Sequence, residues 1–465
     1  MTDRPNVVLI VLDAVRYDHC SYSGYQLNTT PNLDNIRGAL YFHKAFSTST
    51  WTLPSHASMF TGLYPTQHGV HVGEGGILSL RLPTFVEKLQ QLGYATAAFS
   101  RNRLLCTFTS FGRGFETFYE VDRDIENKVR RTQTLLNSIR KVKDPKGSGL
   151  GDTIKRAFRM VMRWLLWDIF IPISRSSHSY AAETNKQIRS CLLNVKEPFF
   201  LFINYLDVHD YNIGPFQTIK RLLEKPNVLV SELLAKRSLS VRHMRAYDQS
   251  LYYLDSKLRD LFRFLESKGC MNRTAIIVTS DHGEMLGEKG LFYHKIGYPY
   301  TPLLHVPLVI KDPNTLNNGR MKVDKVLSLA EIGRIILYMV EGKSCLEHIE
   351  KLPDWCGVET RGPIDVQWKK ARARVIHAED LYRALITDSY KLIQDVKKGK
   401  YQLYDLSKDD KKDISEEKKS KFQELIRILK EWEKELIPVS PSEGIYTPKE
   451  EEEIIRRLRS LGYIA

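Results

Sequence analysis

Near its start the chain carries a run of branched aliphatic side chains, Asn6–Leu12, that no charged residue interrupts. A strand with one face in water alternates polar and apolar residues, so this run is typical of a strand buried on both faces, in a parallel sheet between helices. Similar runs recur at residues 94–100, 198–207, 274–281 and 306–311, with helix-like stretches such as residues 82–92 and 241–268 between them. The alternation predicts an α/β fold.

Polar residues follow two of these strand-like runs directly. Asp13 comes after the first run, and Asp281 and His282 come where the run at residues 274–281 ends. Ligands of open α/β sheets bind at the carboxyl ends of the strands, where these side chains would gather. Adjacent Asp and His can present an oxygen and a nitrogen to one cation, whereas Asp13 alone is compatible with a metal ligand, a helix cap or an ion-pair partner.

Thr52 opens a segment with the pattern of a helix start, since Pro54 and a helix-like stretch follow it. Free N–H groups and the dipole at such a helix start favour an anion. A hydroxyl held there by a metal would have a lowered pKa and could attack an ester. The alternative is that Thr52 is a plain helix cap.

Further polar residues come after strand-like runs or the loops that follow them. His209 and His294 could donate hydrogen bonds to anionic oxygens or protonate a leaving group, although a single histidine is more often structural. Asn102 and Lys295 are candidates for contact with a substrate.

Residues from about 120 to 190 interrupt the strand–helix alternation and are expected to form an insertion. Within it, residues 153–173 combine lysine and arginine at helical spacing with tryptophan and other apolar side chains. Such a basic amphipathic helix can lie at an anionic membrane surface, and it can also form a lid on the main domain with its charges in water. It is too short and too charged to span a membrane.

The pattern changes again towards the C-terminus. We expect a large domain over residues 1–345 and a C-terminal subdomain over residues 370–465. In the subdomain, two strand-like runs around a short polar break predict a hairpin, residues 401–406 are a candidate third strand, and residues 408–435 are helix-like.

The 465-residue chain has a formal net charge of +14 and a pI of about 9.3. This balance favours anionic partners, such as sulfated or phosphorylated substrates or anionic lipid, unless it is only a basic, soluble surface. No nucleic-acid-binding module accompanies the charge, so we expect no nucleic-acid partner. Scattered cysteines without a CxxC pair, and an N-terminus without a signal-peptide pattern, predict a cytoplasmic location, with the inner membrane face as a further contact.

Taken together, these motifs resemble the sulfatase family of the alkaline phosphatase superfamily. The resemblance is carried by residues 6–13, 30–34, 52–62, 281–288, 305–308 and 403–406. It implies a central mixed, mainly parallel sheet between helices, and a small C-terminal antiparallel sheet with a helix. It also implies one divalent metal beside a nucleophile.

Three positions depart from the family pattern. Thr52 stands where sulfatases have the Cys or Ser that becomes formylglycine, and threonine cannot give that aldehyde. Its alkoxide resembles the nucleophile of related phosphoglycerol and phosphoethanolamine transferases and phosphodiesterases. Ala14 replaces the usual second Asp of the first motif, and His56 replaces the Arg near the nucleophile.

The resemblance to the transferase branch implies four metal ligands, Asp13, Thr52, Asp281 and His282. Manganese is the expected ion, because a nitrogen ligand and a reduced number of carboxylates favour it over calcium. Zinc, magnesium and calcium are the alternatives, and no formylglycine is expected.

We therefore expect a metal-dependent hydrolase or transferase that cleaves a phosphate ester or phosphodiester through a phosphothreonine at residue 52. His56, His209 and His294 are the other expected catalytic residues, and Asn102 and Lys295 the expected substrate contacts. One alternative is a sulfuric ester hydrolase with an unmodified hydroxyl. Another, of a different class, is an inactive protein that binds anionic lipid through residues 153–173. The oligomeric state is left open.

Overall fold

The computed structural model describes residues 4–71, 77–120, 180–211, 239–294, 297–315, 319–361, 380–408 and 412–438. The amphipathic segment at residues 153–173 and Lys295 lie outside the described residues, so the expectations for them stay predictions. Within those ranges, no helix is both long enough and apolar enough to cross a membrane.

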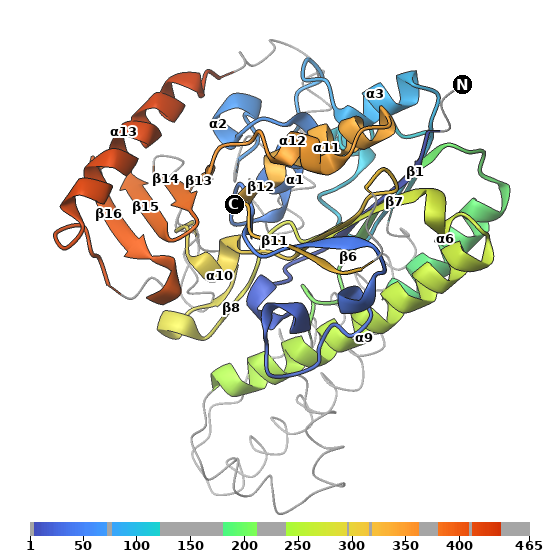
Figure 1. Ribbon diagram of the computed structural model, residues 1–465, viewed down its shortest axis with the longest axis horizontal. Coiled ribbons are helices and arrows are strands. Elements are labelled where there is room, and N and C mark those ends of the chain that lie inside the picture. Colours follow the sequence, from blue (N-terminus) through green and yellow to red (C-terminus); the bar gives the residue numbers. More distant parts are fainter. Residues whose placement is uncertain are drawn as a thin grey trace, which may run out of the picture.

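Eight strands of the described chain form one sheet in the order β11-β2-β10-β7-β1-β6-β4-β5 (Figure 1). They are β1 (Asn6–Leu12), β2 (Ala39–Phe42), β4 (Ala95–Ser100), β5 (Thr117–Tyr119), β6 (Phe199–Tyr205), β7 (Thr274–Thr279), β10 (Leu308–Lys311) and β11 (Met321–Val323). The strands from β7 to β5 run parallel, as do β2 and β11, whereas β10 is antiparallel to both neighbours. The expected mixed, mainly parallel sheet is confirmed.

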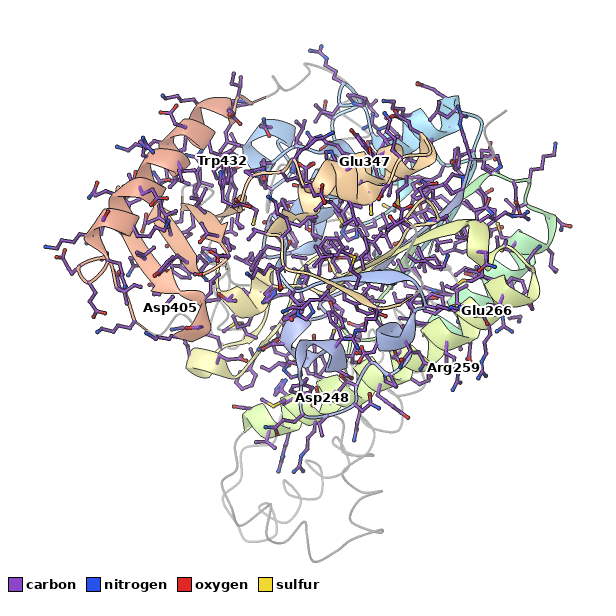
Figure 2. The ribbon with its side chains drawn as sticks, viewed as in Figure 1. Asp248, Arg259, Glu266, Glu347, Asp405 and Trp432 are labelled. Atoms are coloured by element: carbon purple, nitrogen blue, oxygen red, sulfur yellow. The ribbon has the colours of Figure 1, made fainter. Side chains whose placement is uncertain are left out.

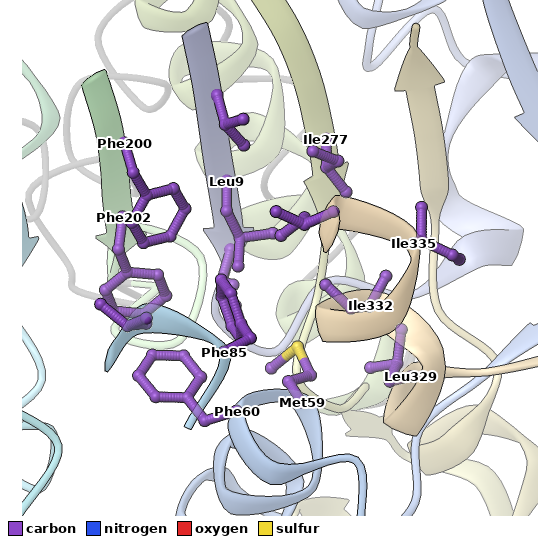
Figure 3. Packing of buried hydrophobic residues seen from close by; sticks show 14 of the residues in the cluster. Leu9, Met59, Phe60, Phe85, Phe200, Phe202, Ile277, Leu329, Ile332 and Ile335 are labelled. Atoms are coloured by element: carbon purple, nitrogen blue, oxygen red, sulfur yellow. The ribbon is translucent and has the colours of Figure 1, made fainter. Parts of the chain in front are cut away.

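The strand β1 lies between β6 and β7 and is buried along its whole length, because helices cover both faces of the sheet. Alternate side chains point to opposite faces, so Leu9 packs in one hydrophobic cluster and Ile10 in the other. The first face is covered by α1 (Thr52–Thr61), α3 (Phe85–Gln91) and α11 (Ile332–Val340), as Figure 3 shows, and the second by α6 (Tyr180–Asn194) and α9 (Leu239–Ser267). Charged side chains such as Arg259 and Glu266 line the outer side of α9 (Figure 2).

The helix α3 begins later than the pattern at residues 82–92 predicts. Thr84 is its N-cap: the Thr84 hydroxyl accepts from the Glu87 backbone N–H, and the Glu87 carboxylate accepts from the Thr84 N–H. This capping box satisfies the free donors of the first turn and fixes the start of the helix at Phe85. The helix expected at residues 241–268 forms as α9.

The C-terminal sheet is antiparallel, in the order β13-β14-β15-β16. Its strands are β13 (Trp355–Arg361), β14 (Leu381–Thr387), β15 (Tyr390–Asp395) and β16 (Lys400–Asp405), and α13 (Lys419–Glu435) packs on it through Leu425, Leu429 and Trp432. The predicted hairpin is β14–β15. The strand β13 lies between the two ranges expected for the domains, and the sequence pattern does not indicate it. The polar residues Glu359 and Thr360, which contact the large domain, interrupt its apolar pattern.

The described residues also form several short elements outside these two sheets. They are β3 (Ala45–Phe46), β8 (Met285–Leu286), β9 (Phe292–Tyr293), β12 (Leu327–Ser328), α2 (Pro65–His68), α10 (Thr301–Leu304) and α12 (Cys345–Ile349). In Figure 1, α10 lies between the C-terminal sheet and the central sheet.

Candidate metal centre and active site

The candidate site forms where the carboxyl ends of four parallel strands meet the start of α1. Asp13 follows β1, Asp281 follows β7 by one residue, Asn102 follows β4, and Asn204 lies near the end of β6. One ligand atom each from Asp13, Asp281 and His282 lies within 4.8 Å of the other two, and all three residues are buried. The structure therefore brings together three of the residues that the sequence pattern indicates.

The imidazole of His282 has the tautomer that a metal ligand needs. Its Nδ1 lies 2.9 Å from the Gly283 carbonyl oxygen, which can only accept, so Nδ1 carries the proton and Nε2 keeps its lone pair. Burial lowers the pKa of His282 to about 3, which keeps the ring neutral. Nε2 is 3.5 Å from Asp281 Oδ2 and 3.8 Å from Asp13 Oδ1.

In the carboxylates of Asp13 and Asp281, one oxygen accepts hydrogen bonds and the other accepts none among the described residues. Asp13 Oδ2 accepts from the side-chain amides of Asn102 at 2.9 Å and Asn204 at 3.5 Å. Asp281 Oδ1 accepts from the backbone N–H groups of Ala14 at 3.2 Å and His282 at 3.0 Å. Asp13 Oδ1 and Asp281 Oδ2 are buried without a hydrogen-bond partner among the described residues.

Such orphaned buried oxygens are costly unless a cation satisfies them. Burial, reinforced by the charge of Asp281, raises the pKa of Asp13 to about 6, and burial also raises the pKa of Asp281. Two carboxylate oxygens, an imidazole nitrogen and a nearby hydroxyl form a donor set that fits manganese, zinc or magnesium.

Thr52 is the first residue of α1, and its side chain does not cap the helix. The N-cap is Trp51, which makes no side-chain cap hydrogen bond. The Thr52 hydroxyl instead lies 3.3 Å from His282 Nε2 and 3.5 Å from the Asn102 amide nitrogen. The interpretation of Thr52 as a plain helix cap is therefore wrong. The hydroxyl instead faces the metal motif, which is Asp13, Asp281 and His282, at the positive end of a helix dipole.

His56 lies one turn along α1 and is fully buried. Its Nδ1 donates to the Thr52 carbonyl oxygen at 2.9 Å and is 3.6 Å from Asp281 Oδ2. Burial lowers the pKa of His56, so the imidazole is neutral and does not replace the charge of the arginine usual at this position.

Two more imidazoles extend from the metal motif in a row. The ring centroids of His282 and His294 are 4.4 Å apart, and those of His294 and His209 are 4.8 Å apart. Burial alone would lower the pKa of His209, but Asp13, Asp210 and Glu284 outweigh it and raise the pKa to about 10. The charges of these carboxylates therefore favour the cationic form of His209, beside which an anionic group could bind.

Glu284 and Asn204 are site residues that the sequence patterns do not single out. Glu284 Oε2 lies 3.1 Å from His294 Nδ1, and burial raises the pKa of Glu284 to about 8. Asn204 is the one amide in the otherwise apolar and aromatic strand β6, and that polar interruption is a usable signal. For Glu284, charged motif residues of the same kind are often solvated, so only the structure reveals its burial.

Ala14 stands where the sulfatase pattern has its second Asp, and only its backbone contacts the site. Its φ of 64° is in the left-handed region, which costs a residue with a side chain about 1–2 kcal/mol. The Tyr247 hydroxyl donates to the Ala14 carbonyl oxygen at 2.7 Å and holds this conformation. The Ala14 N–H thereby points at Asp281 Oδ1, where it fixes the orientation of that carboxylate.

Known proteins resemble this chain over most of its length. The family model described as Sulfatase matches residues 5–339. An arylsulfatase of Clostridium perfringens is 25% identical, over 92% of this chain and 94% of its own, and a choline-sulfatase of Rhizobium meliloti is 21% identical, over 79% and 74%.

Solved structures show the same fold. The phosphonate monoester hydrolase of Agrobacterium radiobacter has a TM-score of 0.63 at 17% identity and covers 93% of this chain and 96% of its own. A protein solved with its substrate D-glucosamine-2-N,6-O-disulfate has a TM-score of 0.65 at 16% identity, with 93% and 98% covered.

Proposed function

Since this chain belongs to the sulfatase family of hydrolases, we propose that it is a metal-dependent enzyme that cleaves a phosphate ester or phosphodiester with Thr52 as the nucleophile. The observation that carries the proposal is the Thr52 hydroxyl, which lies 3.3 Å from His282 Nε2 beside two orphaned carboxylate oxygens. Threonine cannot become formylglycine, so the hydroxyl itself has to supply the nucleophilic oxygen.

The residues that would hold the metal are Asp13, Thr52, Asp281 and His282, and manganese is the ion that we expect. A divalent ion bound there lowers the pKa of a hydroxyl and offsets negative charge on the ester oxygens. The ion would also satisfy the two carboxylate oxygens that lack a partner among the described residues.

In the proposed reaction, the Thr52 hydroxyl gives its proton to solvent water, and its Oγ1 forms a bond to phosphorus while the bond to the leaving oxygen breaks. His209 donates a hydrogen bond to an anionic oxygen of the ester, and protonated His294 gives a proton to the leaving oxygen. The oxygen of water or an alcohol then attacks phosphorus, its proton passes to His294, and the bond from phosphorus to Thr52 Oγ1 breaks. Asn102 and Lys295 are proposed to contact the ester, and His56 to hold the Thr52 carbonyl in place.

The test is to expose the protein to a panel of phosphoesters with added Mn²⁺ and to search for phosphothreonine at residue 52 by mass spectrometry. We expect a phosphorylated peptide with wild-type protein, and loss of both the peptide and turnover in Thr52→Ala. Thr52→Ser, which keeps a hydroxyl, serves as the matched control and should retain turnover. A Thr52→Ala variant with full turnover would refute the mechanism.

A sulfuric ester is the second candidate substrate, because the relatives named above include an arylsulfatase and a choline-sulfatase. Aryl sulfate, phosphate monoester and phosphodiester should therefore be assayed side by side. If the sulfate is the best substrate of the unmodified protein, the phosphate proposal is wrong.

The third candidate, an inactive protein that binds anionic lipid through residues 153–173, predicts different behaviour. It requires binding to anionic liposomes that is lost when this segment is deleted, and no turnover of any ester. Turnover that depends on Thr52 excludes it.

A further inference from the structure

The turn that precedes α10, and α10 itself, connect the metal motif to the C-terminal sheet. In Figure 1, α10 lies beside β14 and β15 on one side and close to the central sheet on the other. Leu304 of α10 packs in an apolar cluster with side chains of the C-terminal sheet. Both sides of the connection also contain hydrogen bonds between polar groups, which fix direction as well as distance.

At the site, α10 supports the backbone of the metal motif. The Gly283 N–H, one residue after His282, donates to the Leu303 carbonyl oxygen at 2.9 Å. The approach is close: a Cβ at Gly283 would lie 2.0 Å from the Pro302 carbonyl oxygen. Any displacement of α10 is therefore passed directly to Gly283 and to the neighbouring His282.

At the other side, Lys391 of β15 holds the start of α10. Its ammonium donates to the Pro299 carbonyl oxygen at 2.8 Å and to the Thr301 hydroxyl at 2.9 Å. Neighbouring strands hold the same turn, since the Thr360 hydroxyl donates to the Gly297 carbonyl oxygen and the Tyr298 hydroxyl donates to the Gln402 side chain at 3.1 Å.

Lys391 is an unusual residue for a role in plain packing, because it is 0% exposed. A buried ammonium loses its hydration and is tolerated only when protein groups replace the water. An aliphatic side chain in the same place would avoid that cost. Two acceptors of the Lys391 ammonium, Pro299 and Thr301, lie in the turn before α10 and at the first residue of α10, so these contacts fix the start of the helix.

We propose that Lys391 is a positioning residue, through which the C-terminal sheet fixes α10 and thereby the geometry of the metal ligands Asp281 and His282. The inference rests on the proposed metal site and adds the C-terminal subdomain to it. It predicts that the affinity for the metal depends on a residue that does not touch the metal.

The experiment compares the Mn²⁺ dissociation constant and the thermal midpoint of the full chain in wild type, Lys391→Met and Leu429→Ala. Lys391→Met removes the ammonium and keeps the aliphatic stem. Leu429→Ala also destabilises the C-terminal subdomain, but from the α13 side of the sheet, away from α10. We expect Lys391→Met to weaken Mn²⁺ binding about tenfold or more, as removal of outer partners of metal ligands does. Leu429→Ala should lower the midpoint and leave the dissociation constant unchanged.

The inference is overturned if Lys391→Met binds Mn²⁺ like wild type, or if Leu429→Ala weakens binding to the same extent. If Lys391→Met does not fold, Thr301→Val is measured in its place, because it removes one acceptor of the Lys391 ammonium and keeps the shape of the side chain. Unchanged Mn²⁺ binding in Thr301→Val then overturns the inference. A wild-type chain that binds no divalent ion would refute the proposed metal site as well, and is thereby distinguished from failure of the positioning role alone.

Discussion

Replacement of Gly283 by alanine tests how tightly the metal motif is packed against α10. The new Cβ would lie 2.0 Å from the Pro302 carbonyl oxygen and 3.1 Å from Arg16 Cγ. Because real Cβ contacts are essentially never shorter than 3.0 Å, the two backbones have to separate by about 1 Å. The clash is with backbone, so no side-chain rotation relieves it.

The expected magnitude follows from the contacts that are lost. Separation breaks the 2.9 Å hydrogen bond from the Gly283 N–H to Leu303. An unpaired buried amide costs about 1–3 kcal/mol, and overpacking costs about as much again, so the free energy of unfolding should fall by about 2–6 kcal/mol. Metal–ligand distances tolerate only about 0.2 Å, so the displacement of His282 should weaken Mn²⁺ binding by about 100-fold.

The assay is titration calorimetry with Mn²⁺, together with urea unfolding of the metal-free protein. Gly269→Ala is the matched control: its φ of +69° makes alanine unfavourable, but nothing lies within 4 Å of the new Cβ. It should lose about 1–2 kcal/mol of stability and keep its metal affinity. Wild-type Mn²⁺ binding by Gly283→Ala, or equal weakening in Gly269→Ala, would refute the reasoning.

Three further predictions concern the buried charges. Burial raises the pKa of Asp207 from 3.8 to about 7, so the contribution of the protonated carboxyl to stability is complete below pH 3.8 and is lost as the pH rises through 7. In urea unfolding, Asp207→Asn should therefore gain stability over wild type by up to about 4 kcal/mol between pH 4 and pH 8.5. A stability difference between the two proteins that stays constant with pH would contradict this. Glu284→Gln should weaken the hydrogen bond that orients His294, the proposed proton donor to the leaving oxygen. Turnover should fall about tenfold or more for esters with poor leaving groups, which need that proton, and less for p-nitrophenyl esters. An equal loss for both kinds of ester would show a purely structural role. Chelation with EDTA should lower the free energy of unfolding by about 2.7 kcal/mol relative to protein with Mn²⁺ at 100 times its dissociation constant, and a thermal midpoint that ignores Mn²⁺ would argue against the site.

Much of the fold follows from local pattern. The uninterrupted aliphatic run of β1 requires burial on both faces, and the chain provides it by placing β6 and β7 beside β1 and helices above and below. The start of α3 could also have been read from Thr84 and Glu87, whose spacing matches a capping box.

The arrangement of the site is only partly visible in the sequence. Asp13, Asp281 and His282 stand at strand ends, and the parallel pairing of β1 with β7 brings them together. The side-chain direction of Thr52 depends on where the N-cap falls, which the pattern around Pro54 does not decide. The contribution of Lys391 could not be predicted, because a lysine in an antiparallel strand is usually exposed.

The pairing of distant segments also governs when the site can exist. The hydrogen bond from Ala14 to Asp281 joins residues 267 positions apart, and β1, which precedes Asp13, pairs with β6 and β7, both far along the chain. Contacts of such long range are slow to form, because the entropy of loop closure is spent before they stabilise the chain. A growing or partly folded chain therefore holds the Thr52 hydroxyl without the side chains that would activate it. High-affinity uptake of Mn²⁺ during refolding should accordingly appear among the last events, and it would report completion of the native topology.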